Sequence, residues 1–150
     1  MEHEKGIIEN FKAATDAIKL AETNILEAEE LKADVNVALE QLEHARAAMT
    51  VFEYAEVISF ANKSIKESKI AKEAKVKASI KLAEENMDAA IKIGANVDKQ
   101  KEILNESNSL LIAGDYKGAL KKAEEALKGS ESIMIQYFLL FFHQRRNTLQ

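Results

Sequence analysis

The stretch Ala113-Gly114-Asp115-Tyr116-Lys117-Gly118-Ala119-Leu120 decides how this chain folds. Glycine takes a positive φ without steric penalty, so Gly114 suits the position just after a helix. Asp115 is a preferred N-cap, because its carboxylate accepts hydrogen bonds from the free amides of a first helical turn. The stretch therefore predicts a tight turn that leads into a new helix.

The residues after this turn follow the period of an α-helix. Apolar and small side chains recur at steps of four and three, at Tyr116, Leu120, Ala123, Leu127 and Ser130. An alanine such as Ala123 does not hold a neighbour away, so a second helix can approach near the short end of the ~8–10 Å range. The pattern predicts a closely packed helix pair.

The same pattern occurs 62 residues earlier. Tyr54, Ile58, Ala61, Ile65 and Ser68 correspond one for one to the five positions above. Upstream, the segment Ile18-Lys19-Leu20-Ala21-Glu22 returns as Ile80-Lys81-Leu82-Ala83-Glu84 at the same offset. A constant offset predicts an internal duplication, and periods above ~20 residues indicate stacked repeats.

These patterns predict helices over 5–32, 35–49, 53–93, 97–112 and from 115 onward. Asp34 and Asn96 are the expected N-caps of the two short helices. Thr50 and Glu53 match a capping box, with a continuous helix through residue 52 as the alternative. The long helix would extend ~60 Å at 1.5 Å per residue.

The expected fold is all-α, with two tandem three-helix units that share one long central helix, connected as in spectrin-like arrays. The units are expected at 4–70 and 71–132, followed by an apolar and aromatic C-terminal extension at 133–150. A polar gap through Lys69 and Lys72 is interpreted as the junction between the units. The expected buried positions of the first two helices are Phe11, Ala14, Ile18, Ala21, Ile25, Ala28, Val35, Leu39, Leu42 and either Ala45 or Arg46.

Residues 98–128 resemble the helix pair of a tetratricopeptide-type repeat. The resemblance is carried by Leu104, Ser107, Leu111, Gly114-Asp115-Tyr116, Ala119-Leu120 and Ala126-Leu127. The chain departs from that family in its internal period, in having no closing proline and in lacking the large aromatic of the first helix. A looser resemblance to tandem three-helix-bundle repeats of archaeal proteins covers more of the chain, and it implies a helical-repeat architecture.

Composition narrows the classes of function. The chain has no proline, five glycines and abundant helix formers, which is typical of a nearly all-helical protein. Its net charge of −4 gives no electrostatic reason to expect nucleic-acid binding. No cysteine is present for a disulfide or a thiolate site, and the charged N-terminus lacks the apolar core of a signal peptide. We expect a cytoplasmic protein.

The polar residues do not form a recognisable catalytic or cofactor pattern. His3, His44 and His143 are far apart in sequence, and Glu40 to His44 is the nearest approach to a metal-binding pair. The adjacent carboxylates at 29–30, 84–85 and 124–125 point about 100° apart on a helix and do not share a site. The basic run is interpreted as a solvated junction, with an anionic partner or lipid headgroups as the alternative: Lys63, Lys66, Lys69, Lys72, Lys75 and Lys77. We expect no enzyme, cofactor or metal.

The C-terminal extension has no counterpart in the first repeat, and its apolar positions go all round a helix. Tyr137, Phe138, Phe141 and Phe142 hold four of the nine aromatic side chains. The ten-residue run at 133–142 is too short to span a membrane, which needs ~20 residues. Three interpretations stay open: a core or homo-oligomer interface, shallow insertion at a membrane surface helped by the arginines at 145–146, or a segment that is not native to the protein.

The favoured hypothesis is a non-enzymatic helical-repeat scaffold that binds a protein partner of unknown identity. A groove between a short and a long helix would hold it, with Tyr54 and Tyr116 as candidate contacts or, more simply, as wedges at the turns. The alternative is a self-assembling spacer or rod whose extension drives dimerisation or touches a membrane surface. A helical-bundle enzyme with metal-binding carboxylates is a third hypothesis.

Overall fold

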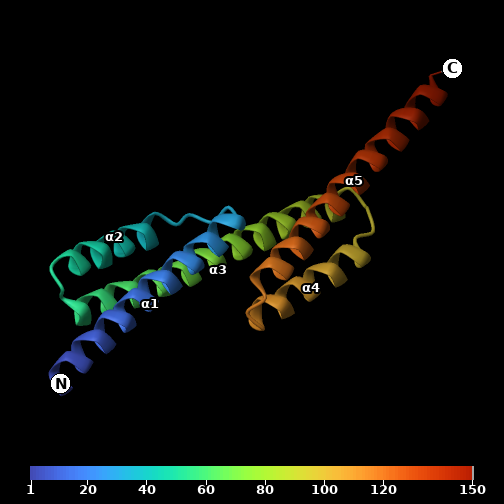
Figure 1. Cartoon of the computed structure of the whole chain (residues 1–150). Helices are drawn as coiled ribbons and strands as arrows, with labels where there is room; N and C mark the ends of the chain where they lie inside the picture. The colour runs from blue at the N-terminus through green and yellow to red at the C-terminus, as the bar shows by residue number, and fades with distance from the viewer. Residues whose placement is uncertain (150) are drawn as a thin grey trace. The chain divides into compact units, whose positions relative to one another are not determined.

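The protein is all-α in the computed structural model, which describes residues 1–149 (Figure 1). No β-strand occurs within these residues. The five helices are α1 (Glu2–Glu30), α2 (Asn36–Thr50), α3 (Tyr54–Lys92), α4 (Asp98–Ile112) and α5 (Tyr116–Thr148). The predicted fold class is confirmed, and every predicted helix boundary lies within three residues of the observed one.

The chain forms two compact units that share α3. The first unit, Met1–Lys75, contains α1, α2 and the first part of α3. The second unit begins at Val76 and contains the rest of α3 together with α4 and α5. Three helical segments therefore build each unit, and the long central helix contributes one of them to both.

The helix boundaries of the two units match at a spacing of 62 residues. Asn36–Thr50 and Asp98–Ile112 are the two short helices, and the helices that follow them begin at Tyr54 and Tyr116. The spacing also holds for the backbone hydrogen bond that closes the long helix before each short one, which measures 3.0 Å in both units. Sequence segments of matching pattern therefore adopt the same local structure.

Four residues with positive φ end the helices that precede the turns. Their φ values are 58° at Lys32, 89° at Gly94, 60° at Phe52 and 82° at Gly114. The left-handed conformation closes a helix and costs little only at glycine. The first unit uses Lys32 and Phe52 where the second uses glycines, so residues 51–53 form a turn and the continuous-helix alternative is wrong.

The predicted N-cap at Asp115 is confirmed, because its carboxylate accepts a hydrogen bond from the Gly118 amide at 2.9 Å. Asp34 and Asn96 stand one residue before the true N-caps of α2 and α4. Each still accepts a hydrogen bond from the amide two residues ahead, at 3.0 and 2.9 Å. The turn chemistry was predicted correctly, and the cap position was wrong by one residue.

The predicted capping box at Thr50 and Glu53 is wrong. The Thr50 hydroxyl donates to the Ala47 carbonyl at 2.6 Å instead of accepting from Glu53. The Glu53 amide donates to the Ala48 carbonyl at 3.1 Å. The left-handed conformation of Phe52 folds the chain back over the last turn of α2. The Glu53 amide therefore bonds to a backbone carbonyl of α2 and not to the Thr50 side chain.

Alanine and serine occupy much of the core, so the helices pack closely. Ala14, Ala21, Ala28, Ala45, Ala61, Ala83, Ala90, Ala119, Ala123 and Ala126 are all fully buried. The Ser64 hydroxyl of α3 donates to the Ala38 carbonyl of α2 at 2.8 Å. In the second unit the Ser107 hydroxyl of α4 donates to the Ala119 carbonyl of α5 at 2.6 Å. These bonds require neighbouring backbones at short separation, as the small side chains predicted.

The buried face of α3 is rotated relative to the prediction. Of the predicted positions, Ala61 and Ser68 are fully buried, whereas Tyr54, Ile58 and Ile65 are only half-buried. Val57 and Ser64, which the spacing did not indicate, are also fully buried. In the first unit α3 contacts α2 through Ser64 and α1 through Lys72, so its buried arc is centred between two neighbours. The spacing of apolar residues along one helix predicts one buried stripe, and it does not locate the centre of an arc that two neighbouring helices bury. Two predicted core positions of α1 and α2, Phe11 and Leu39, are exposed, and of the alternatives Ala45 and Arg46 it is Ala45 that is fully buried.

The interpretation of the basic run as solvated is wrong at Lys72, which is buried. Only 8% of this residue is exposed, and its ammonium lies 3.3 Å from a carboxylate oxygen of Glu27 on α1. The apolar stem of a lysine packs well against neighbouring side chains while its charge meets a partner at the surface. Lys72 therefore fastens α3 to α1 in the first unit.

The turns offer a paired test of the left-handed positions. Gly114→Ala is expected to lower the free energy of unfolding by about 1–2 kcal/mol, because a side chain at positive φ is strained. Lys32→Gly is expected to raise it by about 0.5–1 kcal/mol, since the relieved strain exceeds the entropy cost of glycine. Urea denaturation of both variants provides the measurement. Changes of the same sign in both variants would contradict the assignment.

Candidate functional site

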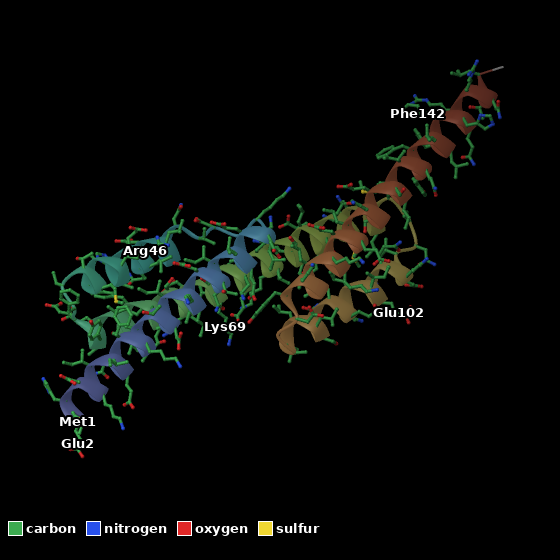
Figure 2. All side chains as sticks on the ribbon, viewed as in Figure 1. Met1, Glu2, Arg46, Lys69, Glu102 and Phe142 are labelled. Carbon is green, nitrogen blue, oxygen red and sulfur yellow. The ribbon has the colours of Figure 1, made fainter. Side chains whose placement is uncertain are left out.

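The C-terminal part of α5 presents a continuous exposed apolar surface. We call residues 133–142 the apolar end of α5. The exposed fraction is 41% for Tyr137, 47% for Phe138, 51% for Phe141 and 63% for Phe142. In Figure 1 the last turns of α5 extend past α4, and Figure 2 shows Phe142 projecting from this stretch. The four predicted interface residues are thus presented to solvent and are not packed into a core.

Tyr137 is the point where the apolar end meets the rest of the second unit. A Cβ placed on Gly94 would stand 3.3 Å from the Tyr137 hydroxyl, so the tyrosine tip covers the turn between α3 and α4. The counterparts of these residues 62 positions earlier are Lys32 and Lys75, which line an open pocket of ≈ 440 Å³. An aromatic side chain therefore covers in the second unit a corner that remains open in the first.

Charges flank the apolar end of α5 on both sides. Glu131 precedes it, and Arg145 and Arg146 follow it in the last turns of the helix. None of the helices within residues 1–149 is both long enough and apolar enough to cross a membrane. The apolar end is therefore a short apolar surface bounded by opposite charges.

The two candidate tyrosines stand at the first position of the helix that follows each turn. Tyr54 is half-buried, and its ring packs edge-on against Phe11 at 6.0 Å and against Phe52 at 6.4 Å between ring centres. Tyr116 is also half-buried, at the start of α5. These contacts hold the Tyr54 ring against its turn, and neither tyrosine is among the lining residues of the pocket at Lys32 and Lys75.

A groove lies between the short helix α4 and the long helix α5, and the predicted contact Tyr116 does not line it. It is open, with a volume of ≈ 680 Å³, and its lining includes Glu102, Asn105, Leu110 and Lys122. An ion pair spans it, since the Lys122 ammonium lies 3.0 Å from the Glu106 carboxylate. That carboxylate raises the pKa of Lys122. The groove is shallow, and sequence spacing did not predict its lining.

The other shifted groups are dispersed. Glu43 and Glu22 raise the pKa of Arg46, which joins α2 to α1, and a hydrogen bond with Glu56 raises the pKa of Glu53 at the start of α3. His44 stacks on Phe60 at 5.2 Å. Within residues 1–149, no cluster of three or more His, Asp or Glu side chains has a geometry that would hold a metal ion.

Comparisons with protein-family models, with curated proteins and with solved structures found no match for this chain. The most distinctive surface on the described residues is the apolar end of α5, because it combines large exposed aromatic side chains with a rigid helical backbone. The functional assignment therefore depends on the chemistry of that surface.

Proposed function

We propose that this protein is a non-enzymatic helical scaffold that binds another protein chain through the apolar end of α5. The main observation in support of this proposal is that four aromatic side chains are exposed on one helical segment: Tyr137, Phe138, Phe141 and Phe142. The largest apolar patch on a monomeric protein is typically about 300–600 Å² and is often a contact site. Aromatic residues are also the side chains most enriched at energetically important interface positions.

The helical state of the segment supports this role. The apolar end belongs to α5, which begins in the core of the second unit and is fixed there by Ala119, Ala123 and Ala126. A contact surface that is already folded loses less conformational entropy when it binds. The second unit would then act as the frame that holds the surface in place. Tyr54 and Tyr116 are proposed as secondary contacts at the turns.

A matched pair of triple variants tests the proposal. Phe138→Ser, Phe141→Ser and Phe142→Ser are combined in one chain, and Leu20→Ser, Leu26→Ser and Leu82→Ser in the other. The control leucines are 55%, 59% and 51% exposed but scattered over α1 and α3. Sedimentation equilibrium measures self-association of each purified variant. Crosslinking in an extract of the source cells measures its association with other proteins. We expect only the first variant to lose association, with helical content kept in both.

The proposal is wrong if the apolar-end variant associates as the intact chain does. It is also wrong if the control variant loses association to the same degree, because scattered leucines would then contribute as much as the contiguous surface. Circular dichroism on the same samples separates both outcomes from unfolding.

The second candidate is a self-assembling spacer. It is favoured by α3, whose 39 residues form one helix that supplies an element to each unit. A spacer needs its ends joined to neighbouring molecules, and the apolar end of α5 would supply one such contact. Both candidates therefore use the apolar end of α5 as a contact surface, and only the spacer requires that the bound chain be another copy.

A further inference from the structure

The geometry points to a second copy of this chain as the partner of the apolar end of α5. The two copies would pair through this segment as antiparallel helices that cross at Phe138. This inference rests on the proposed function, because it names the chain that the contact surface holds. Its support comes from area, from the position of the charges and from the direction in which the surface faces.

The exposed area suits a small dimer contact. Phe138, Phe141 and Phe142 lie on one side of α5, since steps of three and four residues stay on one helical face. Taking about 200 Å² for each aromatic side chain, their exposed parts present roughly 320 Å² of accessible surface. Ile135, which is 60% exposed, lies on the same side and adds to this area. The total is roughly half of the ~800 Å² per partner of a standard contact, which is typical of weak, reversible association.

The charged residues are placed symmetrically about Phe138. Glu131 lies seven residues before it and Arg145 seven residues after it. Seven residues are close to two helical turns, with a drift of only ~20°, so the three side chains share one stripe of α5. In an antiparallel pair that crosses at Phe138, each Glu131 lies opposite the partner copy's arginine at 145.

A parallel pair lacks this complementarity. Each Arg145 and Arg146 would then stand beside the same arginines of the second copy, and like charges at close range oppose association. Antiparallel pairing replaces that repulsion with two equivalent attractions. It also gives a two-fold contact in which the same surface is used by both copies, the commonest arrangement in homo-oligomers.

The stripe lies about 100° around α5 from the side that faces the core of the second unit. Ser130 is fully buried on the side of α5 that packs into the unit, as are Ala123 and Ala126. Glu131 is one residue further on, about 100° around the helix, and Phe138 follows Tyr137 by the same step. Tyr137 continues the core-facing side by covering Gly94. A second helix can therefore lie along the stripe without displacing the unit.

Charge reversal tests the pairing without touching the apolar contacts. Sedimentation equilibrium is run on the intact chain, on Glu131→Arg, on Arg145→Glu and on the double variant. We expect the intact chain to form a dimer of a 16.7 kDa protomer. Each single reversal should weaken the dimer about tenfold, because exposed pairs contribute up to ~1 kcal/mol and two are lost. The double variant should return to within about threefold of the intact chain.

Introduced thiols report the direction of the pair, since the chain has no cysteine of its own. Glu131→Cys and Arg145→Cys are prepared as separate proteins and oxidised alone and mixed. Antiparallel pairing predicts a disulfide mainly between the two different variants. Efficient crosslinking of each variant with itself would overturn the antiparallel arrangement.

Three results would overturn the inference: an intact chain that stays at 16.7 kDa up to about 100 µM, a double variant that is no better than the single ones, or flotation of a monomeric chain with anionic lipid vesicles. A monomer that still captures another protein through its aromatic side chains would overturn only this inference. The proposed function would then stand, so the two failures are distinguishable.

Discussion

Replacing Leu42 with alanine is expected to lower the free energy of unfolding by about 2–5 kcal/mol, the usual cost of removing a buried leucine side chain. Leu42 is 2% exposed at the centre of α2, where it packs in a cluster with residues of α1 and α3. Few other large side chains fill that core, so the alanine-lined surroundings cannot easily close over the cavity. Chemical denaturation monitored by circular dichroism provides the measurement.

Leu104 is the counterpart of Leu42 in the second unit and is 5% exposed. Leu104→Ala is expected to cost a similar amount, because it occupies the matching position of α4. Leu20→Ala serves as the control, since Leu20 is 55% exposed on α1 and should change stability by less than about 0.5 kcal/mol. A cost of under 1 kcal/mol for both buried leucines would contradict the described cores.

The second large effect is expected from overpacking. Ala123→Leu should lower the free energy of unfolding by about 1–3 kcal/mol, because Ala123 is fully buried in the second unit and there is no space for three further carbons. Ala61→Leu, its counterpart on α3, should do the same in the first unit. An alanine side chain makes no hydrogen bond, so neither substitution removes one. The expected loss of stability therefore comes from overpacking alone.

Ala55→Leu is the matched control for overpacking. Ala55 is exposed in the first turn of α3, and leucine is nearly as good a helix former as alanine. Thermal and urea denaturation of the three variants should separate the two buried positions from the exposed one. Equal stability of all three would mean that the buried faces of α3 and α5 are assigned to the wrong side.

Much of the fold was predictable because its signals are local. Gly114 and Asp115 indicated a turn and a helix start from backbone preferences alone, and the 62-residue offset then transferred that boundary to Tyr54. The turn at Phe52 has no local signal of its own, since an aromatic residue in a left-handed conformation has no sequence signature. Its prediction depended on the comparison with the glycine at the matching position.

The errors came from interactions between helices. Lys72 was expected in solvent, but Glu27 lies 45 residues earlier in the sequence, and only the packing of α1 against α3 brings the two charges together. The buried face of α3 was misplaced for the same reason, because two neighbours rather than one determine it. Spacing along one helix does not contain that information.

The residues of the candidate site could be predicted from the sequence, but their exposure to solvent could not. An apolar run containing Tyr137 and Phe138 was apparent in the sequence, yet a core role and a surface role were equally compatible with it. The structure places the run on a helix end that is exposed, apart from the contact of Tyr137 with the turn at Gly94. The run is exposed because α5 is longer than its neighbouring helices and continues beyond the part of it that they bury.

The claim that the apolar end of α5 is a contact surface and not core is tested most directly by shortening the chain. A protein that ends at Tyr137 retains the contact with Gly94 and loses Phe138, Phe141 and Phe142. Urea denaturation of both proteins, at concentrations low enough to keep the intact chain monomeric, compares their free energies of unfolding. We predict a difference within about 0.5 kcal/mol, the range typical of surface changes. A loss of about 2 kcal/mol or more, typical of buried aliphatic or aromatic side chains, would show that these residues stabilise the core and would contradict the account.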